Sequence, residues 1–460
     1  CFISNHTYIS GLTHRQMRAS LIKSFSKIRI IDIHGSKVVS EQAPDNEFDE
    51  NIFDIKQGVA IMLGSRGSDI RAIEYTDMWG SRESKYQRLR DNSALDWSQI
   101  EPSRPGYYFC PRENPHELEF SSFTSLQEIF LVNSSGIQTK RDELFVDFDA
   151  QKVAERWTEV LDIESDNSAL EKKYPLHSTS GWSPKKLEGA IFDRNNIKSY
   201  TYRPFDERNI YYDPPLLGRP RSKIFHNFLR PNRGLSTLRQ TVDTSFRHVF
   251  CVSKLCDMNL TINHHVSDRV FPLYLYNEVD HSDSRDSNFS ASTLDRIARA
   301  TGLEWNATNL NRCDSSFGPE DMFAYVVAIL HADEYRLRYW ASLKEELPRI
   351  PLNPSKDIFR KLVVLGESIF EAESSPNYRL SGFTVDWLGS LPLSKKLLPR
   401  LEDQTLWLDA NKTCGFRPLS EEIWNYKVGA YQVCEKWIKS RKDRRFSEVD
   451  IEAFIRVIHG

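Results

Sequence analysis

The residues best suited to chemistry lie in one arginine-rich stretch. Between Pro214 and Val242 the sequence has six basic side chains and no acidic one, although the whole chain carries a formal net charge of −3. The six are Arg219, Arg221, Lys223, Arg230, Arg233 and Arg239. A forked guanidinium suits phosphates and guanine edges, and Tyr211 and Tyr212 precede the run as candidate stacking partners. The stretch therefore predicts either a nucleic-acid contact or a solvated basic face.

A second candidate is the small polar loop from Ser134 to Asp142. It contains Thr139 and two adjacent cations, Lys140 and Arg141. Small polar residues let backbone amides approach a phosphate closely, but the same composition is typical of an ordinary turn.

Catalytic patterns are weak in this sequence. Asp213-Pro-Pro-Leu216 resembles the (D/N)PP(Y/F) element of amino-group methyltransferases, but the aromatic fourth residue that stacks on a flipped base is Leu. A turn at the end of a strand is the alternative interpretation of Asp213. There is no GxG turn for a nucleotide cofactor, no P-loop and no GxSxG motif. The His264-His265 pair has no neighbouring Cys and no HExxH frame, so we expect no metal site.

Composition sets the outer limits. A chain of 460 residues with 40% hydrophobic and 27% charged residues is typical of two or three globular domains. The seven cysteines show no CxxC spacing, which favours reduced thiols in a cytoplasmic protein. No apolar run is long enough to span a membrane. The chain begins with Cys1 in a strand-like segment, and we interpret it as a piece of a longer polypeptide.

Three regions with different local patterns must position these residues. Residues 1–64 predict an α/β fragment, with strands at Phe2–Ser4 and Lys27–His34 around a helix that begins near Thr13. Residues 65–280 predict a strand- and loop-rich α+β region. Residues 290–460 predict a helix-rich part, after a Ser/Asp/Asn-rich linker at residues 281–289.

Several ordered blocks resemble the C-terminal portion of Type ISP restriction–modification enzymes. As a set they are specific, because they follow one another over nearly the whole chain. They are ISNHTYISGLTHRQMR (3–18), IIDIHGSKVVSE (30–41), DENIFDIKQGVAI (49–61), SSGIQTKRDELFVDF (134–148), YRPFDERNIYYDPPLLGRPRSKIFHN (202–227), FPLYLY (271–276), GPEDMFAYVVAILHADEYRLRYWASLKEELPRIPL (318–352) and GAYQVCEKWIKSRK (429–442).

The resemblance implies that residues 1–64 are the last strands of a Rossmann-like adenine DNA methyltransferase domain. Its S-adenosylmethionine loop and NPPY element would then lie upstream, together with an ATPase motor and a nuclease. This chain alone should bind neither S-adenosylmethionine nor a metal, and its catalytic residues should lie elsewhere. Within ENIFDIKQGVAI, Phe53 matches the aromatic that packs on a flipped adenine; a core phenylalanine is the alternative.

The resemblance also implies that residues 65–280 are a target-recognition domain for double-stranded DNA and that residues 290–460 complete the specificity domain. The candidate DNA-binding residues are then Thr139, Lys140, Arg141, Arg203, Arg208, Tyr211, Tyr212, Arg219, Arg221, Lys223, Arg230, Arg233, Arg239 and Arg247.

Two other functions stay open at this point. One is a non-catalytic DNA specificity protein that recruits separate methyltransferase or nuclease subunits. The other is an RNA-modifying relative.

Overall fold

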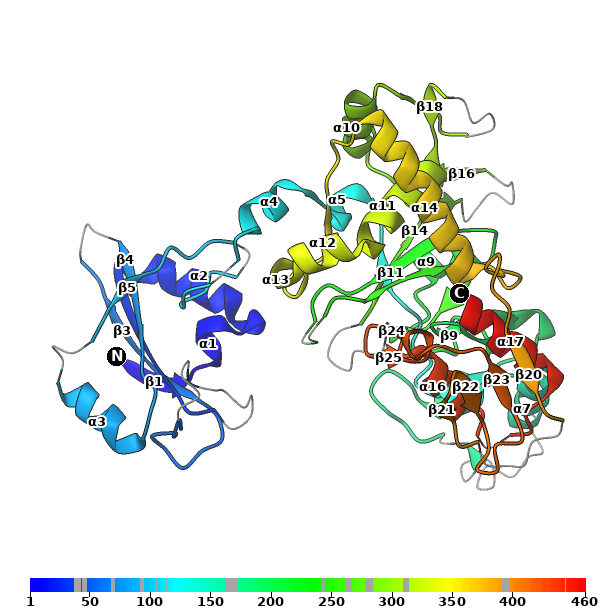
Figure 1. The fold of residues 1–460 in the computed structure, drawn as a ribbon, viewed down its shortest axis with the longest axis horizontal. Coiled ribbons are helices and arrows are strands. Elements are labelled where there is room, and N and C mark those ends of the chain that lie inside the picture. Colours follow the sequence, from blue (N-terminus) through cyan, green and yellow to red (C-terminus); the bar gives the residue numbers. More distant parts are fainter. Residues whose placement is uncertain are drawn as a thin grey trace. The chain divides into compact units, whose positions relative to one another are not determined.

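The computed structural model divides the chain into two units, residues 1–115 and 116–460 (Figure 1). The described residues are 1–36, 43, 48–67, 71–91, 95–104, 106–112, 114–161, 173–174, 176–241, 243, 245–261, 267–277, 284–308, 314–390, 397–442 and 444–460. The His264-His265 pair and residues 281–283 of the expected linker lie outside them. The rest of that segment is not a linker, because residues 285–287 form a strand and Phe289 packs in a hydrophobic core. None of the helices in these ranges is both long and apolar enough to cross a membrane.

The first unit is built on a five-stranded sheet of order β1-β3-β2-β4-β5. The strands are β1 (Phe2–Asn5), β2 (Lys27–His34), β3 (Val59–Ser65), β4 (Ala72–Asp77) and β5 (Ser98–Gln99). The helices are α1 (Thr7–Ser10), α2 (Arg15–Ser24) and α3 (Arg82–Arg90). Because β4 pairs in parallel with β2, the first unit continues beyond residue 64.

Strand β2 is buried on both faces, as its run of isoleucines predicts. Ile28 and Ile30 pack into one cluster with Met62, and Ile31 and Ile33 pack into another on the opposite face. Side chains alternate between the faces of a strand, so each face needs its own apolar layer. The pattern from Thr13 to Gln16 predicts a capping box, which is wrong: the 3-10 turn η1 (Leu12–His14) precedes α2, and no side chain caps the helix.

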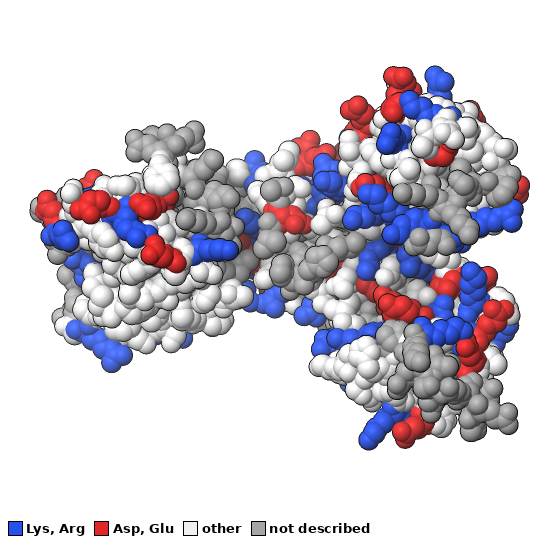
Figure 2. All heavy atoms as spheres, turned by 90° about the horizontal axis from the view of Figure 1, so that it is seen from below, with Lys and Arg blue, Asp and Glu red and all other residues white. Residues whose placement is uncertain are grey.

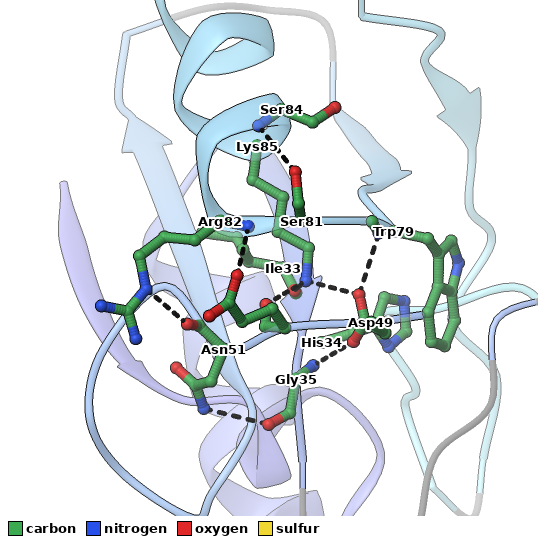
Figure 3. A network of polar contacts seen from close by, with 12 residues as sticks. Ile33, His34, Gly35, Asp49, Asn51, Trp79, Ser81, Arg82, Ser84 and Lys85 are labelled. Carbon is green, nitrogen blue, oxygen red and sulfur yellow. Dashed lines mark hydrogen bonds and ion pairs between the residues drawn. The ribbon is translucent and has the colours of Figure 1, made fainter. Parts of the chain in front are cut away.

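One buried ion pair holds together the loops at one edge of this sheet (Figure 3). Lys85 Nζ lies 2.6 Å from Asp49 Oδ1 and donates to the carbonyls of Ile33 (2.8 Å) and Glu50 (2.7 Å). Asp49 accepts hydrogen bonds from the amides of Gly35 (2.7 Å) and Gly80 (3.0 Å). The segments just after β2 and β4 are therefore fixed to one point.

The second unit is a mixed α/β structure with several small sheets. Its four-stranded sheets have the orders β13-β9-β10-β8, β12-β11-β14-β7 and β20-β23-β22-β21. Their strands are β7 (Ser134–Ser135), β8 (Val146–Asp147), β9 (Ile197–Arg203), β10 (Asp206–Tyr211), β11 (Gly234–Thr237), β12 (Val249–Val252), β13 (Leu255–Cys256), β14 (Arg269–Pro272), β20 (Asp386–Leu388), β21 (Arg400–Glu402), β22 (Thr405–Trp407) and β23 (Gly415–Arg417).

Shorter strand pairs complete the second unit. They are β6 (Thr124–Ser125) with β19 (Arg349–Ile350), β15 (Tyr274–Tyr276) with β16 (Arg285–Ser287), β17 (Glu304–Trp305) with β18 (Ser316–Phe317), and β24 (Lys427–Val428) with β25 (Tyr431–Gln432).

Helices lie on both sides of residue 280. The α-helices are α4 (Glu117–Ser122), α5 (Leu126–Ile129), α6 (Asp142–Phe145), α7 (Ala150–Val160), α9 (Ser222–Phe225), α10 (Ala291–Thr301), α11 (Pro319–His331), α12 (Asp333–Arg338), α13 (Trp340–Leu343), α14 (Lys356–Ser374), α15 (Glu421–Trp424), α16 (Val433–Lys439) and α17 (Glu448–His459). The short 3-10 turns are η3 (Pro184–Leu187), η4 (Arg194–Asn196) and η5 (His226–Phe228).

Two hydrophobic cores stabilise the second unit. In one, Trp157 of α7 and Tyr211 of β10 pack with Trp437 of α16 and Phe454 of α17, so the end of the chain closes over the β9–β10 hairpin. In the other, α11 and α14 pack against the sheet that contains β11 (Figure 1). The helices approach closely because Gly366 has no side chain: a Cβ there would lie 1.9 Å from the Ala324 carbonyl oxygen.

Candidate nucleic-acid interface

The polar loop and the arginine-rich stretch are joined by their backbones. Gln138 and Arg219 exchange two hydrogen bonds, of 3.0 and 2.8 Å, in an isolated antiparallel bridge. Lys140 crosses Gly218, where an added Cβ would lie 2.5 Å from the lysine Cγ. The absent side chain at Gly218 therefore lets the lysine stem lie against the segment that contains Arg219. The two regions that the sequence singled out form one surface.

An open cleft of about 890 Å³ lies beside this bridge. Ser134 and the arginine-rich stretch both line it, and none of the described residues in its lining is acidic. The lining residues are Leu131, Val132, Asn133, Ser134, Arg219, Pro220, Arg221, Ser222, Lys223 and Ile224. A cleft with cations and small polar groups but no carboxylate favours an anionic ligand.

The positive charges of Arg219 and Arg269 both act on Arg221, which lines this cleft. The pKa of Arg221 is lowered by desolvation and, next, by the positive charges of Arg219 and Arg269. Repulsion between like charges at a partly desolvated site raises the free energy of the protein, and a bound anion lowers it again. Arg221 has φ of 53° and lies just before α9, so its left-handed backbone fixes where its side chain leaves the chain.

Lys223 is the third cation of the lining, on an exposed position of α9. On the face drawn in Figure 2, lysine and arginine side chains gather in the middle of the second unit. A phosphate backbone carries regularly spaced charges, so a group of cations on one surface can contact several phosphates at once.

Thr139 and Arg141 support the loop and do not face the cleft. The Thr139 hydroxyl donates to Asp142 and accepts from the Arg141 amide (3.1 Å). Arg141 is buried, donates to the His177 carbonyl and lies 4.9 Å from the centre of the Trp182 ring. These two residues shape the turn that presents Lys140.

Arg203 and Arg208 are used in ion pairs inside the protein. Arg203 Nη1 lies 2.9 Å from the buried carboxylate of Asp257, and Arg208 Nη2 lies 2.7 Å from that of Asp206. Arg441 from beyond α16 reaches the same Asp206 at 2.9 Å. These pairs connect β9 and β10 with their neighbours, which is a structural role.

Tyr211 and Tyr212 lie in the core. Tyr211 stacks on Trp157 with ring centres 4.5 Å apart, and the Tyr212 hydroxyl donates to the Pro220 carbonyl (3.1 Å). Neither ring has a face open for a base. The aromatic spacing in this stretch therefore reflects the hydrophobic core.

Arg230 and Arg233 have partners away from the cleft. Arg233 Nη1 donates to both carboxylate oxygens of Glu367 in α14, each at 2.8 Å, and lies over the Phe370 ring at 4.4 Å. Arg230 lies 5.1 Å from the centre of the Tyr276 ring. Both residues are half-buried.

Arg239 and Arg247 are exposed side chains outside the cleft lining. The Arg247 carbonyl accepts a hydrogen bond from Gly429 (2.8 Å), which connects this segment to the β24–β25 hairpin.

Asp213 forms a turn, as its alternative interpretation predicted. Its carbonyl accepts a hydrogen bond from the Leu216 amide (3.0 Å), and Leu216 is buried. Desolvation and the nearby Asp193 raise the pKa of the Asp213 carboxyl. Lys186 Nζ closes the same turn by donating to the carbonyls of Pro215 (2.8 Å) and Leu217 (2.9 Å).

Arg269 is the site residue that sequence reasoning missed. It lies outside the arginine-rich stretch, but β14 pairs with β7, where Arg269 is opposite Ser135 and beside the cleft-lining Ser134. Only the pairing of distant strands brings it close to Arg221, so no local spacing reveals it.

Phe53 belongs to the first unit and is 41% exposed. Its amide donates to the side chain of Asn51 (2.9 Å), and the Asn51 side chain donates to the carbonyls of Gly35 (3.1 Å) and Gln57 (2.6 Å). The ring therefore lies at the surface of the first unit on a hydrogen-bonded turn.

Comparison with known families places this geometry in context. A model of the "Type ISP C-terminal specificity domain" matches residues 128–455, which is most of the chain. The chain belongs to this family. The match includes the polar loop, the arginine-rich stretch and Arg269, so the cleft lies within the Type ISP specificity domain. No curated protein sequence matches the chain.

Three solved structures share the fold of this chain. The chain aligns over 99% of its length with a cryo-electron microscopy structure of a DrdV–DNA complex, at a TM-score of 0.66 and 20% identity. It aligns equally well, with the same three values, with the ATP-dependent Type ISP restriction-modification enzyme LlaBIII bound to DNA. A nuclease-deletion mutant of the Type ISP enzyme LlaGI, in complex with a DNA substrate mimic, aligns over 99% at a TM-score of 0.62 and 20% identity. The chain spans 49%, 32% and 44% of these three chains.

Proposed function

We propose that the second unit recognises double-stranded DNA in a sequence-specific manner and that the arginine-lined cleft is part of the DNA-binding surface. The observation that carries this proposal is a cleft lined by Arg219, Arg221 and Lys223, with no carboxylate among the described residues of its lining. A phosphate would neutralise this positive charge, and an arginine that reaches a guanine edge would read a base.

The family and the fold support the same ligand. The chain belongs to a specificity-domain family, and the three structures described above are complexes with DNA or a DNA mimic. Of the candidate residues, Arg219, Arg221 and Lys223 line the cleft, and Lys140 lies against the segment that contains Arg219. We assign DNA contact to these four and to Arg269.

For the first unit we propose the end of a Rossmann-like adenine methyltransferase domain. The parallel pairing of β2 with β4 is consistent with that class of sheet. The intact enzyme would transfer a methyl group from S-adenosylmethionine to the adenine amine, with its cofactor loop, NPPY element, ATPase motor and nuclease in other parts of a cytoplasmic polypeptide. The present chain supplies no cofactor loop and would not bind S-adenosylmethionine by itself.

The exposed ring of Phe53 fits a stacking role on an extruded adenine. In the intact enzyme, Phe53→Ala would then lose about 1–3 kcal/mol of base stacking with little effect on folding. A large fall in melting temperature with unchanged methylation would instead assign Phe53 to the core.

A non-catalytic specificity protein is the second candidate. The observation in its favour is that the family match covers 128–455 and leaves the whole first unit, residues 1–115, outside. A methylation assay of the intact polypeptide distinguishes the two, since a specificity protein transfers no methyl group without a separate subunit.

The proposal is tested by selecting duplexes from a randomised DNA library with the purified chain. Recovery of one enriched sequence, bound more tightly than its scrambled version and than the matching RNA duplex, is the expected result. Equal binding to all sequences would reject sequence-specific recognition, and preference for RNA would favour an RNA-modifying relative.

A further inference from the structure

Side chains from three strands of the first unit meet at one edge of its sheet. Strand β1 is antiparallel to β3, β3 is antiparallel to β2, and β2 is parallel to β4, so β1, β2 and β4 run in the same direction. His6 follows β1, and Asp32 and His34 end β2. The carboxyl ends of strands that run in the same direction lie at the same sheet edge, where open α/β sheets bind ligands.

The three side chains are close enough to share an ion. One potential ligand atom from each of His6, Asp32 and His34 lies within 4.8 Å of the others. His6 Nδ1 is 3.3 Å and His34 Nδ1 is 3.9 Å from Asp32 Oδ1. Ligand atoms around a tetrahedral Zn²⁺ lie about 3.3 Å apart, given bonds of about 2.0–2.2 Å, so the ligand atoms must close in by up to about 1.5 Å when an ion binds.

The second nitrogen of His34 faces a carboxylate, as in many metal sites. His34 Nε2 is 3.7 Å from Asp77 Oδ2, and Asp77 Oδ2 accepts a hydrogen bond from the Trp79 ring nitrogen (2.9 Å). A carboxylate on the far side of a metal-binding histidine fixes the tautomer and the ring orientation. Trp79 also stacks on His34, with ring centres 3.5 Å apart and planes inclined by 14°, as Figure 3 shows.

The backbone around His34 is arranged to hold this position. His34 has φ of 53°, and the pairing of β2 with β3 is irregular between Asp32 and His34. β-Bulges and residues with a left-handed backbone conformation change the direction of side chains beside functional sites. The Lys85–Asp49 pair fixes both neighbours of His34 and the residue after Trp79, because it bonds to Ile33, Gly35 and Gly80.

The position of His6 depends on a glycine in the intervening strand segment. A Cβ on Gly58 would lie 2.6–2.8 Å from three atoms of the His6 ring. The ring therefore crosses the backbone just before β3 and reaches Asp32 only because residue 58 has no side chain. The positions of the candidate ligand atoms therefore depend on five residues: His6, Asp32, His34, Asp77 and Gly58.

In contrast to the expectation from the sequence that this chain binds no metal, we propose that His6, Asp32 and His34 bind a divalent transition-metal ion, with Asp77 orienting His34. Two imidazoles and one carboxylate suit Zn²⁺, Co²⁺ or a similar ion, and three protein ligands leave a position for water. A bound ion connects the end of β1 with the end of β2 across β3. The ion would stabilise the first unit, whereas the cleft belongs to the second, so this inference does not depend on DNA binding by the cleft.

The test uses the full chain after removal of metal with a chelator. Titration with Zn²⁺ followed by calorimetry, and with Co²⁺ followed by visible absorption, should give one saturable site per chain and a rise in melting temperature. His6→Ala and His34→Ala should abolish this site. His14→Ala is the matched control, because His14 is in the same unit and bonds to the neighbouring Thr13 hydroxyl instead; it should bind like the wild type.

Two further variants keep all three metal ligands and so separate an effect on metal binding from an effect on folding. Asp77→Asn should weaken Zn²⁺ binding about 10–100-fold, the usual cost of losing a carboxylate behind a ligating histidine. Gly58→Ala should weaken it by displacing the His6 ring. If the wild-type chain binds no ion, or if His6→Ala and His34→Ala bind as tightly as His14→Ala, the proposal is rejected.

Discussion

Gln138 and Arg219 pair through two backbone hydrogen bonds, of 3.0 and 2.8 Å, and this pairing joins the polar loop to the arginine-rich stretch. Gly218 lies beside it and leaves room for Lys140, since a Cβ would lie 2.5 Å from the lysine Cγ. Gly218→Ala should therefore displace Lys140 and weaken DNA binding about as much as Lys140→Ala does. The double variant should bind no more weakly than either single one, because both changes act on the same lysine. Additive effects in an equilibrium binding assay would show that Lys140 and Gly218 act separately.

Arg233 differs from Arg219 and Arg221, the arginines that line the cleft. It is bonded to both carboxylate oxygens of Glu367, so Arg233→Ala should destabilise the second unit by about 1.5–3 kcal/mol, the range for hydrogen bonds to charged groups. Denaturant unfolding measures this destabilisation. The salt dependence of DNA binding should stay as in the wild type; a smaller dependence would mean that Arg233 contacts a phosphate.

The buried pair of Lys85 and Asp49 should dominate the stability of the first unit. Lys85→Met leaves a buried carboxylate without its cation and should cost about 3–5 kcal/mol. Hydrogen exchange should then accelerate in the peptide that contains Ile33 and Gly35, since both are bonded to this pair. Adding Asp49→Leu should recover part of the stability; no recovery would mean that the hydrogen bonds to the amides matter more than the charge.

Asp268 should make the second unit less stable as the pH rises. Burial raises the pKa of its carboxyl to about 6, although Thr261 donates to it from its amide (2.9 Å) and its hydroxyl (2.7 Å). The folded protein binds this proton more tightly than the unfolded chain does. The resulting stability is fully present below the ordinary pKa of 3.8 and is lost as the pH rises through about 6.

Asp268→Asn removes this titration. The difference in unfolding free energy between wild type and variant should change by about 3 kcal/mol across that window, since each pKa unit corresponds to about 1.4 kcal/mol. Urea unfolding at a series of pH values measures it. Parallel pH profiles for the two proteins would contradict a raised pKa at Asp268.

Long, strongly patterned elements could be predicted from the sequence. Strand β2 has the bounds that its pattern predicts. The patterns of residues 151–161 and of the segment from Pro319 predict helices, and α7 and α11 lie there. Ser447 and Asp450 predict a capping box, which is present at the start of α17. In each, local propensity and burial favour the same structure, so short-range pattern is sufficient.

Short elements are predicted less well. The pattern of Leu118–Phe120 predicts a strand, but these residues lie in α4. The pattern from Ser420 to Ile438 predicts a single helix, but α15 is followed by the β24–β25 hairpin, in which Gly429 has φ of 58°. The four-stranded sheet from β20 to β23 is not predicted within the helix-rich region. Pairing with distant strands decides these segments, and a local pattern does not contain that information.

The residues at the centre of the candidate site could be predicted from the sequence, but the residues at its edges could not. Arg219, Arg221 and Lys223 line the cleft, whereas Arg203 and Arg208 are paired with buried carboxylates. Charge density in the sequence does not distinguish an arginine that is available to a ligand from one that is neutralised by a distant acid. For the same reason the sequence does not reveal the group of His6, Asp32 and His34, since the three fit no ligand spacing.

The salt dependence of DNA binding by single arginine variants tests the central claim most directly. Each phosphate that a cation neutralises contributes about 0.9 to the slope of log affinity against log salt concentration. Arg219→Ala, Arg221→Ala and Lys223→Ala should each weaken binding, and the slope should fall by that amount for every phosphate that the removed side chain neutralises. Arg299→Ala, an exposed arginine on α10, should change neither affinity nor slope. If all three cleft variants keep the wild-type affinity and slope, the cleft is a solvated surface and DNA binds elsewhere.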